Sequence, residues 1–152
     1  MKNFTKIPKK KLYIILITAG VLILALSLEM LIRVKDYTYF QEWLIDIREN
    51  QDAYLSKTDA FNAYLSMNLG YYFISLVVPV IFSLHCYFSY TRLQVNALFI
   101  FLWTVLLVGG LGYTFLEYNY YSPFYYVRLI SYIVLIFTNL SLSKNLSKSK
   151  FL

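Results

Sequence analysis

The longest uncharged stretch of this chain runs from Ala60 to Thr91 and is bounded by Asp59 and Arg92. At 1.5 Å per residue, its roughly 32 residues would form a helix about 48 Å long, whereas the hydrocarbon core of a bilayer is about 30 Å thick. A helix of that length crosses a membrane and projects from one face of it. This stretch therefore limits the possible folds more than any other feature of the sequence.

The composition also favours a membrane protein. Hydrophobic residues make up 59% of the 152 residues and charged residues 14%, whereas charged residues account for roughly 25% of soluble domains. The apolar segments follow one another closely and must bury their polar residues against each other, which indicates a single domain. The abundance of Tyr, Phe, Ile, Leu, Lys and Asn is typical of an AT-rich bacterial genome, so a bacterial plasma membrane is the expected location.

Three further apolar segments complete a pattern of four spans. The predicted fold is an all-α integral membrane protein whose four transmembrane helices cover about 12–34, 64–91, 95–116 and 123–142, with an outer loop at 35–63 and basic tails at 1–11 and 143–152. The first span begins like a signal peptide. Its uncharged run of about 17 residues exceeds the usual 7 to 15, and its cleavage site is weak. We therefore expect the first span to be retained as an anchor.

The charge distribution predicts the orientation of the four spans. If the N-terminus is inside, the inner segments contain basic residues and no acid: Lys2, Lys6, Lys9, Lys10, Lys11, Arg92, Lys144, Lys148 and Lys150. All eight acidic residues then lie outside or at the outer ends of spans. The positive-inside rule places both termini in the cytoplasm. The short connection at 92–94 predicts that the second and third spans are antiparallel neighbours.

The outer loop contains an apolar stripe at helical spacing, formed by Phe40, Trp43, Leu44 and Ile47. Acidic residues lie off this stripe, so the segment is predicted to form a short amphipathic helix. This helix either lies in the membrane interface or packs on the projecting end of the second span. Thr58 is the expected N-cap of that long second helix.

Four charged residues are predicted to lie in the outer third of the bundle: Glu29, Arg33, Glu117 and Arg128. Ionisable groups at membrane depth are costly and often functional, so this cluster is a candidate site for a zwitterionic or anionic headgroup or for a proton relay. The alternative is a structural role, in which the four side chains reach the interface or neutralise one another and set the helix register.

Tyrosines are dense on the outer side. An aromatic belt at the membrane interface accounts for most of them, because the ring lies in the acyl boundary and the hydroxyl in water. The alternative is a contact with another protein or a lipid-linked sugar, since Tyr is enriched at interface hot spots. The candidate contacts are the outer-loop stripe and three tyrosines: Phe40, Trp43, Leu44, Ile47, Tyr64, Tyr120 and Tyr121.

Other functional classes are disfavoured. Cys86 is the only cysteine and His85 the only histidine, so no internal disulfide is possible, and neither a metal site nor a cofactor is expected. The short motifs of hydrolases and phosphate-binding loops are absent from the sequence, so we do not expect an enzyme. The acidic outer loop would repel the phosphates of a nucleic acid.

The leading hypothesis is a non-enzymatic accessory or interaction subunit of a membrane or envelope complex. It would contact another membrane protein, or a second copy of itself, through the outer loop and the projecting helix. The alternative is a carrier or binding protein for a small polar molecule or lipid headgroup, which would use the four outer charges. The sequence names neither the partner nor the ligand.

Overall fold

The computed structural model describes residues 6–51, 56–117 and 121–148. These residues form five helices, α1 (Lys9–Lys35), α2 (Tyr37–Gln51), α3 (Lys57–Thr91), α4 (Ala97–Leu116) and α5 (Pro123–Lys148). By length and composition, α1, α3, α4 and α5 are able to cross a membrane. The predicted helical architecture with four apolar spans is therefore confirmed.

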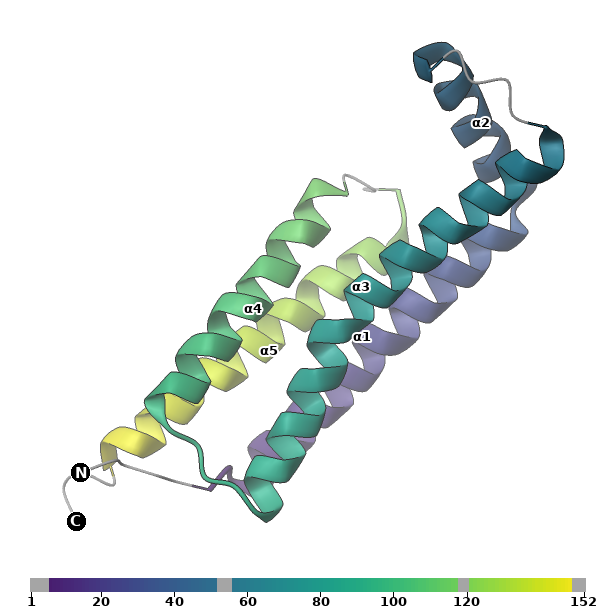
Figure 1. Cartoon of the computed structure of the whole chain (residues 1–152). Coiled ribbons are helices and arrows are strands. Elements are labelled where there is room, and N and C mark those ends of the chain that lie inside the picture. Colours follow the sequence, from purple (N-terminus) through teal and green to yellow (C-terminus); the bar gives the residue numbers. More distant parts are fainter. Residues whose placement is uncertain (1–5, 52–55, 118–120, 149–152) are drawn as a thin grey trace.

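The four long helices form a ring with one open side (Figure 1). α1 packs along both α3 and α5, and α4 packs along α5, whereas α3 and α4 approach each other in few places. The predicted neighbours α3 and α4 are thus joined in the chain, but their main packing partners are α1 and α5. Large aromatic side chains fill the space between α3 and α4 and keep their backbones apart. The ring centroid of Trp103 on α4 lies 5.1 Å from that of Phe82 and 5.8 Å from that of His85, both on α3.

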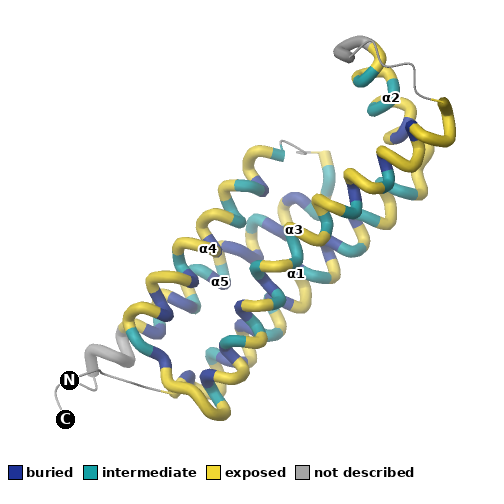
Figure 2. Tube along the Cα trace, viewed as in Figure 1, coloured by how far each residue is buried: buried dark blue, intermediate teal, exposed yellow. Residues whose placement is uncertain are grey.

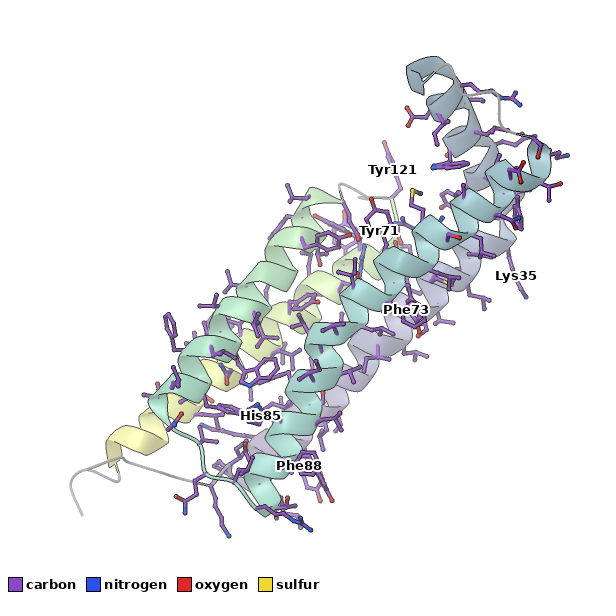
Figure 3. The ribbon with its side chains drawn as sticks, in the orientation of Figure 1. Lys35, Tyr71, Phe73, His85, Phe88 and Tyr121 are labelled. Atoms are coloured by element: carbon purple, nitrogen blue, oxygen red, sulfur yellow. The ribbon has the colours of Figure 1, made fainter. Side chains whose placement is uncertain are left out.

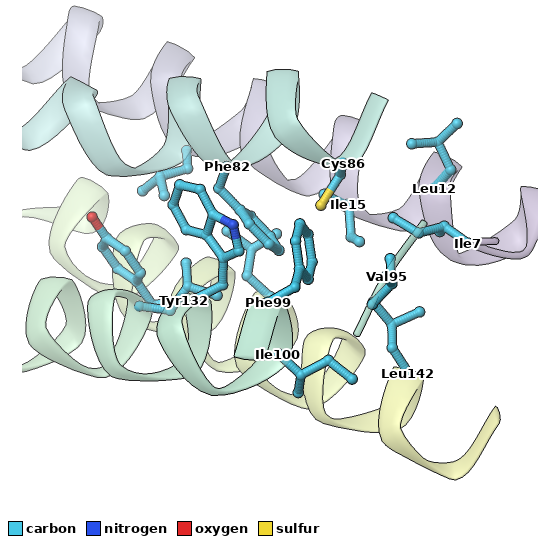
Figure 4. Close-up of a cluster of buried hydrophobic side chains, with 14 of the residues drawn as sticks. Ile7, Leu12, Ile15, Phe82, Cys86, Val95, Phe99, Ile100, Tyr132 and Leu142 are labelled. Carbon is cyan, nitrogen blue, oxygen red and sulfur yellow. The ribbon is translucent and has the colours of Figure 1, made fainter. Parts of the chain in front are cut away.

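The hydrophobic core lies inside this ring and receives side chains from all four long helices (Figure 4). Ile15, Phe82, Cys86, Leu107 and Leu135 are fully buried in it. Buried positions face one another across the bundle, and the outward faces are exposed (Figure 2). The lipid of a bilayer solvates exposed apolar side chains, so the hydrophobic effect does not drive the helices together. Close packing between the helices stabilises the bundle instead.

α1 and α3 continue beyond the ends of α4 and α5, and α2 lies at their far end (Figure 1). α3 has 35 residues and α4 has 20, which correspond to about 52 Å and about 30 Å of helix. Pro79 lies within α3 and does not end it. We call α2 together with the first three turns of α3 (residues 37–51 and 57–68) the projecting lobe.

The N-cap of α3 is Ser56, two residues before the predicted cap, Thr58. The Ser56 hydroxyl accepts a hydrogen bond from the Asp59 amide at 3.2 Å and donates one to the Asp59 carboxylate at 2.6 Å. This reciprocal arrangement satisfies an amide at the first turn that has no partner within the helix. The prediction of Thr58 as N-cap is wrong because Ser56 already fills that role.

An aromatic cluster holds α2 on α3. The rings of Phe40 and Trp43 lie 5.5 and 5.4 Å from the ring of Tyr64, and Ala60 is buried beneath them. The Tyr64 hydroxyl donates a 2.8 Å hydrogen bond to the carbonyl of Arg33, near the end of α1 where carbonyls lack helical partners. Of the two predicted placements of α2, the structure shows the second, with its apolar stripe packed on the projecting end of α3.

α4 and α5 approach each other closely at Gly110. A Cβ atom placed on Gly110 would lie 2.7 Å from the ring of Tyr132, whereas Gly109 and Gly112 have open space at the same position. Tyr132 is itself buried in the core, so its ring has little room to move. The absence of a side chain at Gly110 therefore permits this contact between the two helices.

We predict that Gly110→Ala lowers the free energy of unfolding by about 1–3 kcal/mol, the usual cost of overfilling a packed interior. Gly109→Ala is the matched control. It adds the same methyl group on the exposed side of the same helix and should be neutral or stabilising by up to about 1 kcal/mol. Thermal unfolding of both variants in one detergent measures the difference, and equal midpoints would contradict the assigned contact.

Candidate functional site

The structure brings together the four charged residues that were predicted from the sequence. Arg33 Nη2 lies 2.8 Å from Glu29 Oε1, one helical turn away on α1. The second oxygen of Glu29 lies 3.3 Å from Arg128 Nε on α5, and Arg128 also pairs with the carboxylate of Glu117 at the end of α4. The four residues form a continuous chain of ion pairs, which we call the charge network.

The two central members of the charge network are buried. The side chain of Arg128 is 3% exposed and that of Glu29 is 8%, whereas Arg33 at one end is 32% exposed. Two acids and two bases give the network no net formal charge. Burial of a charge is costly unless an opposite charge compensates it, so each of these residues requires its neighbours.

Arg128 interacts with Glu29 and Glu117 as ion pairs whose geometry is not that of aligned hydrogen bonds. Arg128 Nε and Nη2 and Glu117 Oε2 are buried, and none of them has a hydrogen-bond partner among the described residues. Their ion pairs bring opposite charges together without the alignment that a hydrogen bond requires. The carboxylates of Glu29 and Glu117 therefore occupy the buried Nε and Nη2 of the guanidinium.

A pocket of about 40 Å³ adjoins the charge network and is lined by all four of its members. Asn68, Tyr71, Tyr72 and Ser75 of α3 add polar atoms to the wall. A buried water needs about 10–15 Å³ of this kind of space, so the pocket is large enough for a few waters. It is far smaller than the roughly 300–1,000 Å³ of usual small-molecule sites.

One hydrogen bond between α1 and α3 and another within α3 hold this wall in place. The hydroxyls of Ser27 and Tyr72 lie 2.9 Å apart, two residues along α1 from Glu29. Asn68 is buried and donates to the carbonyl of Tyr64 at 2.9 Å. The sequence places Tyr72 among the outer tyrosines but did not lead us to select Ser27 or Asn68, although an amide inside an uncharged span is a signal that would have found Asn68.

The residues predicted to contact a partner differ in how far the structure buries them. Phe40 and Tyr64 are 2% and 4% exposed because they pack against each other, so neither side chain lies on the outer surface of the projecting lobe. Trp43, Leu44 and Ile47 are partly buried. Tyr121 is fully exposed and belongs to the α4–α5 connection, at the same end of the bundle as Tyr71 (Figure 3). Tyr120 lies outside the described residues.

Within the described ranges, no three His, Cys, Asp or Glu side chains are grouped so that they could hold a metal ion. No family model matches this chain, and neither a characterised protein nor a solved structure is similar to it.

We predict that Arg128→Met lowers the free energy of unfolding by about 3–5 kcal/mol, because it leaves the buried carboxylates of Glu29 and Glu117 without their shared cation. Arg33→Met is the matched control. It removes the same group from the more exposed end of the network and should cost about 1 kcal/mol or less.

The measurement is thermal unfolding of the purified variants in detergent. Glu29→Gln should restore part of the stability in the Arg128→Met background and reduce it in the wild-type background. Equal losses of stability for Arg128→Met and Arg33→Met would show that burial does not determine how much each ion pair contributes to the stability of the fold.

Proposed function

We propose that this chain is a non-enzymatic accessory subunit of a bacterial plasma membrane complex, which holds a partner membrane protein or a second copy through its projecting lobe. The observation that carries the proposal is the fixed position of α2. α1 and α3 extend past α4 and α5, and the Phe40 cluster secures α2 at their end. A surface held in place before binding loses less conformational entropy when a partner arrives.

The exposed side of the projecting lobe has the composition of a contact surface. Tyr37, Tyr39, Ile45 and Phe61 are all exposed there, and aromatic side chains are frequent among the residues that contribute most to binding energy. The buried stripe of α2 thus fixes the helix, and its other face remains available. In this proposal the contact is made by the exposed face and not by Phe40 or Tyr64.

The alternative of a carrier for a polar molecule or headgroup has less support. Its four charges already neutralise one another in pairs, and the pocket beside them has a volume of about 40 Å³. A headgroup would have to break ion pairs that are largely buried, at a cost of several kcal/mol. The geometry fits a structural network with a few internal waters better.

The proposed orientation places the end of the bundle with Lys9, Lys10, Lys11 and Arg92 in the cytoplasm, in accordance with the positive-inside rule. We call this the basic end. The projecting lobe would then face the cell exterior or the periplasm. A partner contact made there would lie in the envelope.

The orientation predicts the reactivity of introduced cysteines. In intact cells, a membrane-impermeant maleimide should label Lys35→Cys beside the projecting lobe, and should label Leu93→Cys at the basic end only after permeabilisation. Both positions are exposed, and the native Cys86 is buried, so the wild-type protein provides an unlabelled background. The reverse pattern would overturn the orientation.

Copurification from native membranes tests the interaction. A tagged wild-type chain should retain a stoichiometric partner in mild detergent, and Ile45→Ala should weaken that association about tenfold if Ile45 belongs to the contact. Ile17→Ala is the matched control, since Ile17 is 66% exposed on α1 and Ile45 is 57% exposed on α2. A chain that purifies alone as a monomer, or that loses its partner equally in both variants, would contradict the proposal.

A further inference from the structure

A second and larger pocket lies at the basic end, where α3 and α4 separate. Its volume is about 510 Å³, which falls within the range of roughly 300–1,000 Å³ for small-molecule sites. His85 of α3 and Trp103 of α4 line it, together with Arg92 in the connection between these helices. Figure 3 shows His85 between α3 and α4.

The lining of this pocket changes from polar to apolar along the bundle axis. Three of the four lining residues in the connection at the end of the bundle are polar, Arg92, Gln94 and Asn96, and the fourth is Leu93, whereas Leu98 and Leu102 lie further along α4. Leu98 is 67% and Leu102 46% exposed, so the apolar part lies on the outward face of α4. A bilayer phospholipid has the same order of groups, with a charged phosphate followed by apolar chains.

The polar part of the pocket favours an anion. Trp103 Nε1–H donates a 3.1 Å hydrogen bond to Nδ1 of His85, and because an indole can only donate, the imidazole proton must be on Nε2. His85, which lines the pocket, therefore carries an N–H donor on Nε2, and Arg92 supplies a guanidinium to the lining. Among the described residues that line it, none is Asp or Glu. Guanidinium groups bind phosphate with two parallel hydrogen bonds, which makes arginine a suitable recognition group.

We propose that this pocket binds an anionic phospholipid of the surrounding bilayer, with the phosphodiester at Arg92 and an acyl chain along Leu98 and Leu102. Unfilled space at membrane depth loses dispersion contacts on every wall, so a pocket open to the bilayer is filled by lipid. Basic pockets between transmembrane helices are known to select anionic headgroups. This inference is independent of the projecting lobe, which lies at the other end of α3.

Trp103 provides a local reporter for the proposed lipid. The chain has two tryptophans, so Trp43→Phe leaves Trp103 as the only one. Trp103 is 3% exposed, hence lipid outside the pocket reaches it poorly, whereas a lipid in the pocket lies beside it. Bromine on an acyl chain quenches tryptophan fluorescence at short range.

The experiment reconstitutes the Trp43→Phe protein in phosphatidylcholine vesicles that contain either brominated phosphatidylglycerol or brominated phosphatidylcholine at equal mole fractions. We expect stronger quenching by phosphatidylglycerol, corresponding to about a fivefold higher relative association constant from one arginine contact. Arg92→Gln should abolish this preference. Lys35→Gln removes an exposed basic charge at the opposite end and should leave the preference unchanged.

Three results would overturn the proposal. Equal quenching by the two lipids would show a pocket filled without selection, and an absence of quenching would show that lipid does not enter it. If Arg92→Gln and Lys35→Gln reduce the preference for phosphatidylglycerol equally, the preference arises from the net charge of the protein and not from the pocket. The comparison between the two lipids needs no substitution at the pocket, so it remains decisive even if Arg92→Gln fails to fold.

Discussion

The buried guanidinium of Arg128 is the group on which the arrangement of α1, α4 and α5 depends. Its two carboxylate partners come from different helices, Glu29 from α1 and Glu117 from the end of α4. A charge at this depth cannot remain uncompensated, so the three helices must meet in one register. Gly110 supports this register, because the close approach of α4 to Tyr132 lies one turn along α5 from Arg128.

The two ends of the bundle differ because different interactions join the helices there. Near the charge network, ion pairs join α1, α4 and α5, and the hydrogen bond between Ser27 and Tyr72 joins α3 to α1. Near the basic end, the rings of His85 and Trp103 stand between α3 and α4 and leave the larger pocket. At the charge network, the polar pocket has room for only a few waters. At the basic end, the larger pocket has polar and apolar walls and opens to the bilayer.

Most members of the charge network could be predicted from the sequence, because their positions depend on spacing along the chain. Glu29 and Arg33 are four residues apart and therefore share one face of a helix. Glu117 and Arg128 lie within a few residues of the ends of neighbouring spans, so both were expected at the same depth. The apolar stripe of α2 was also predicted, but periodicity shows only that a face is apolar, and not what covers it. That face is covered by Tyr64 and Ala60 of the same chain.

The sequence by itself determined the class of the fold, the four apolar helices, the excess length of α3 and the separation of basic from acidic residues. These properties follow from local composition, which is set by the solvent around each segment. Only the tertiary structure decided which faces of the helices meet, that α3 and α4 are held apart and that Phe40 and Tyr64 are internal. In a membrane, lipid-facing and protein-facing residues are both apolar, so hydrophobicity does not distinguish them and side-chain shape and the few polar contacts make the choice.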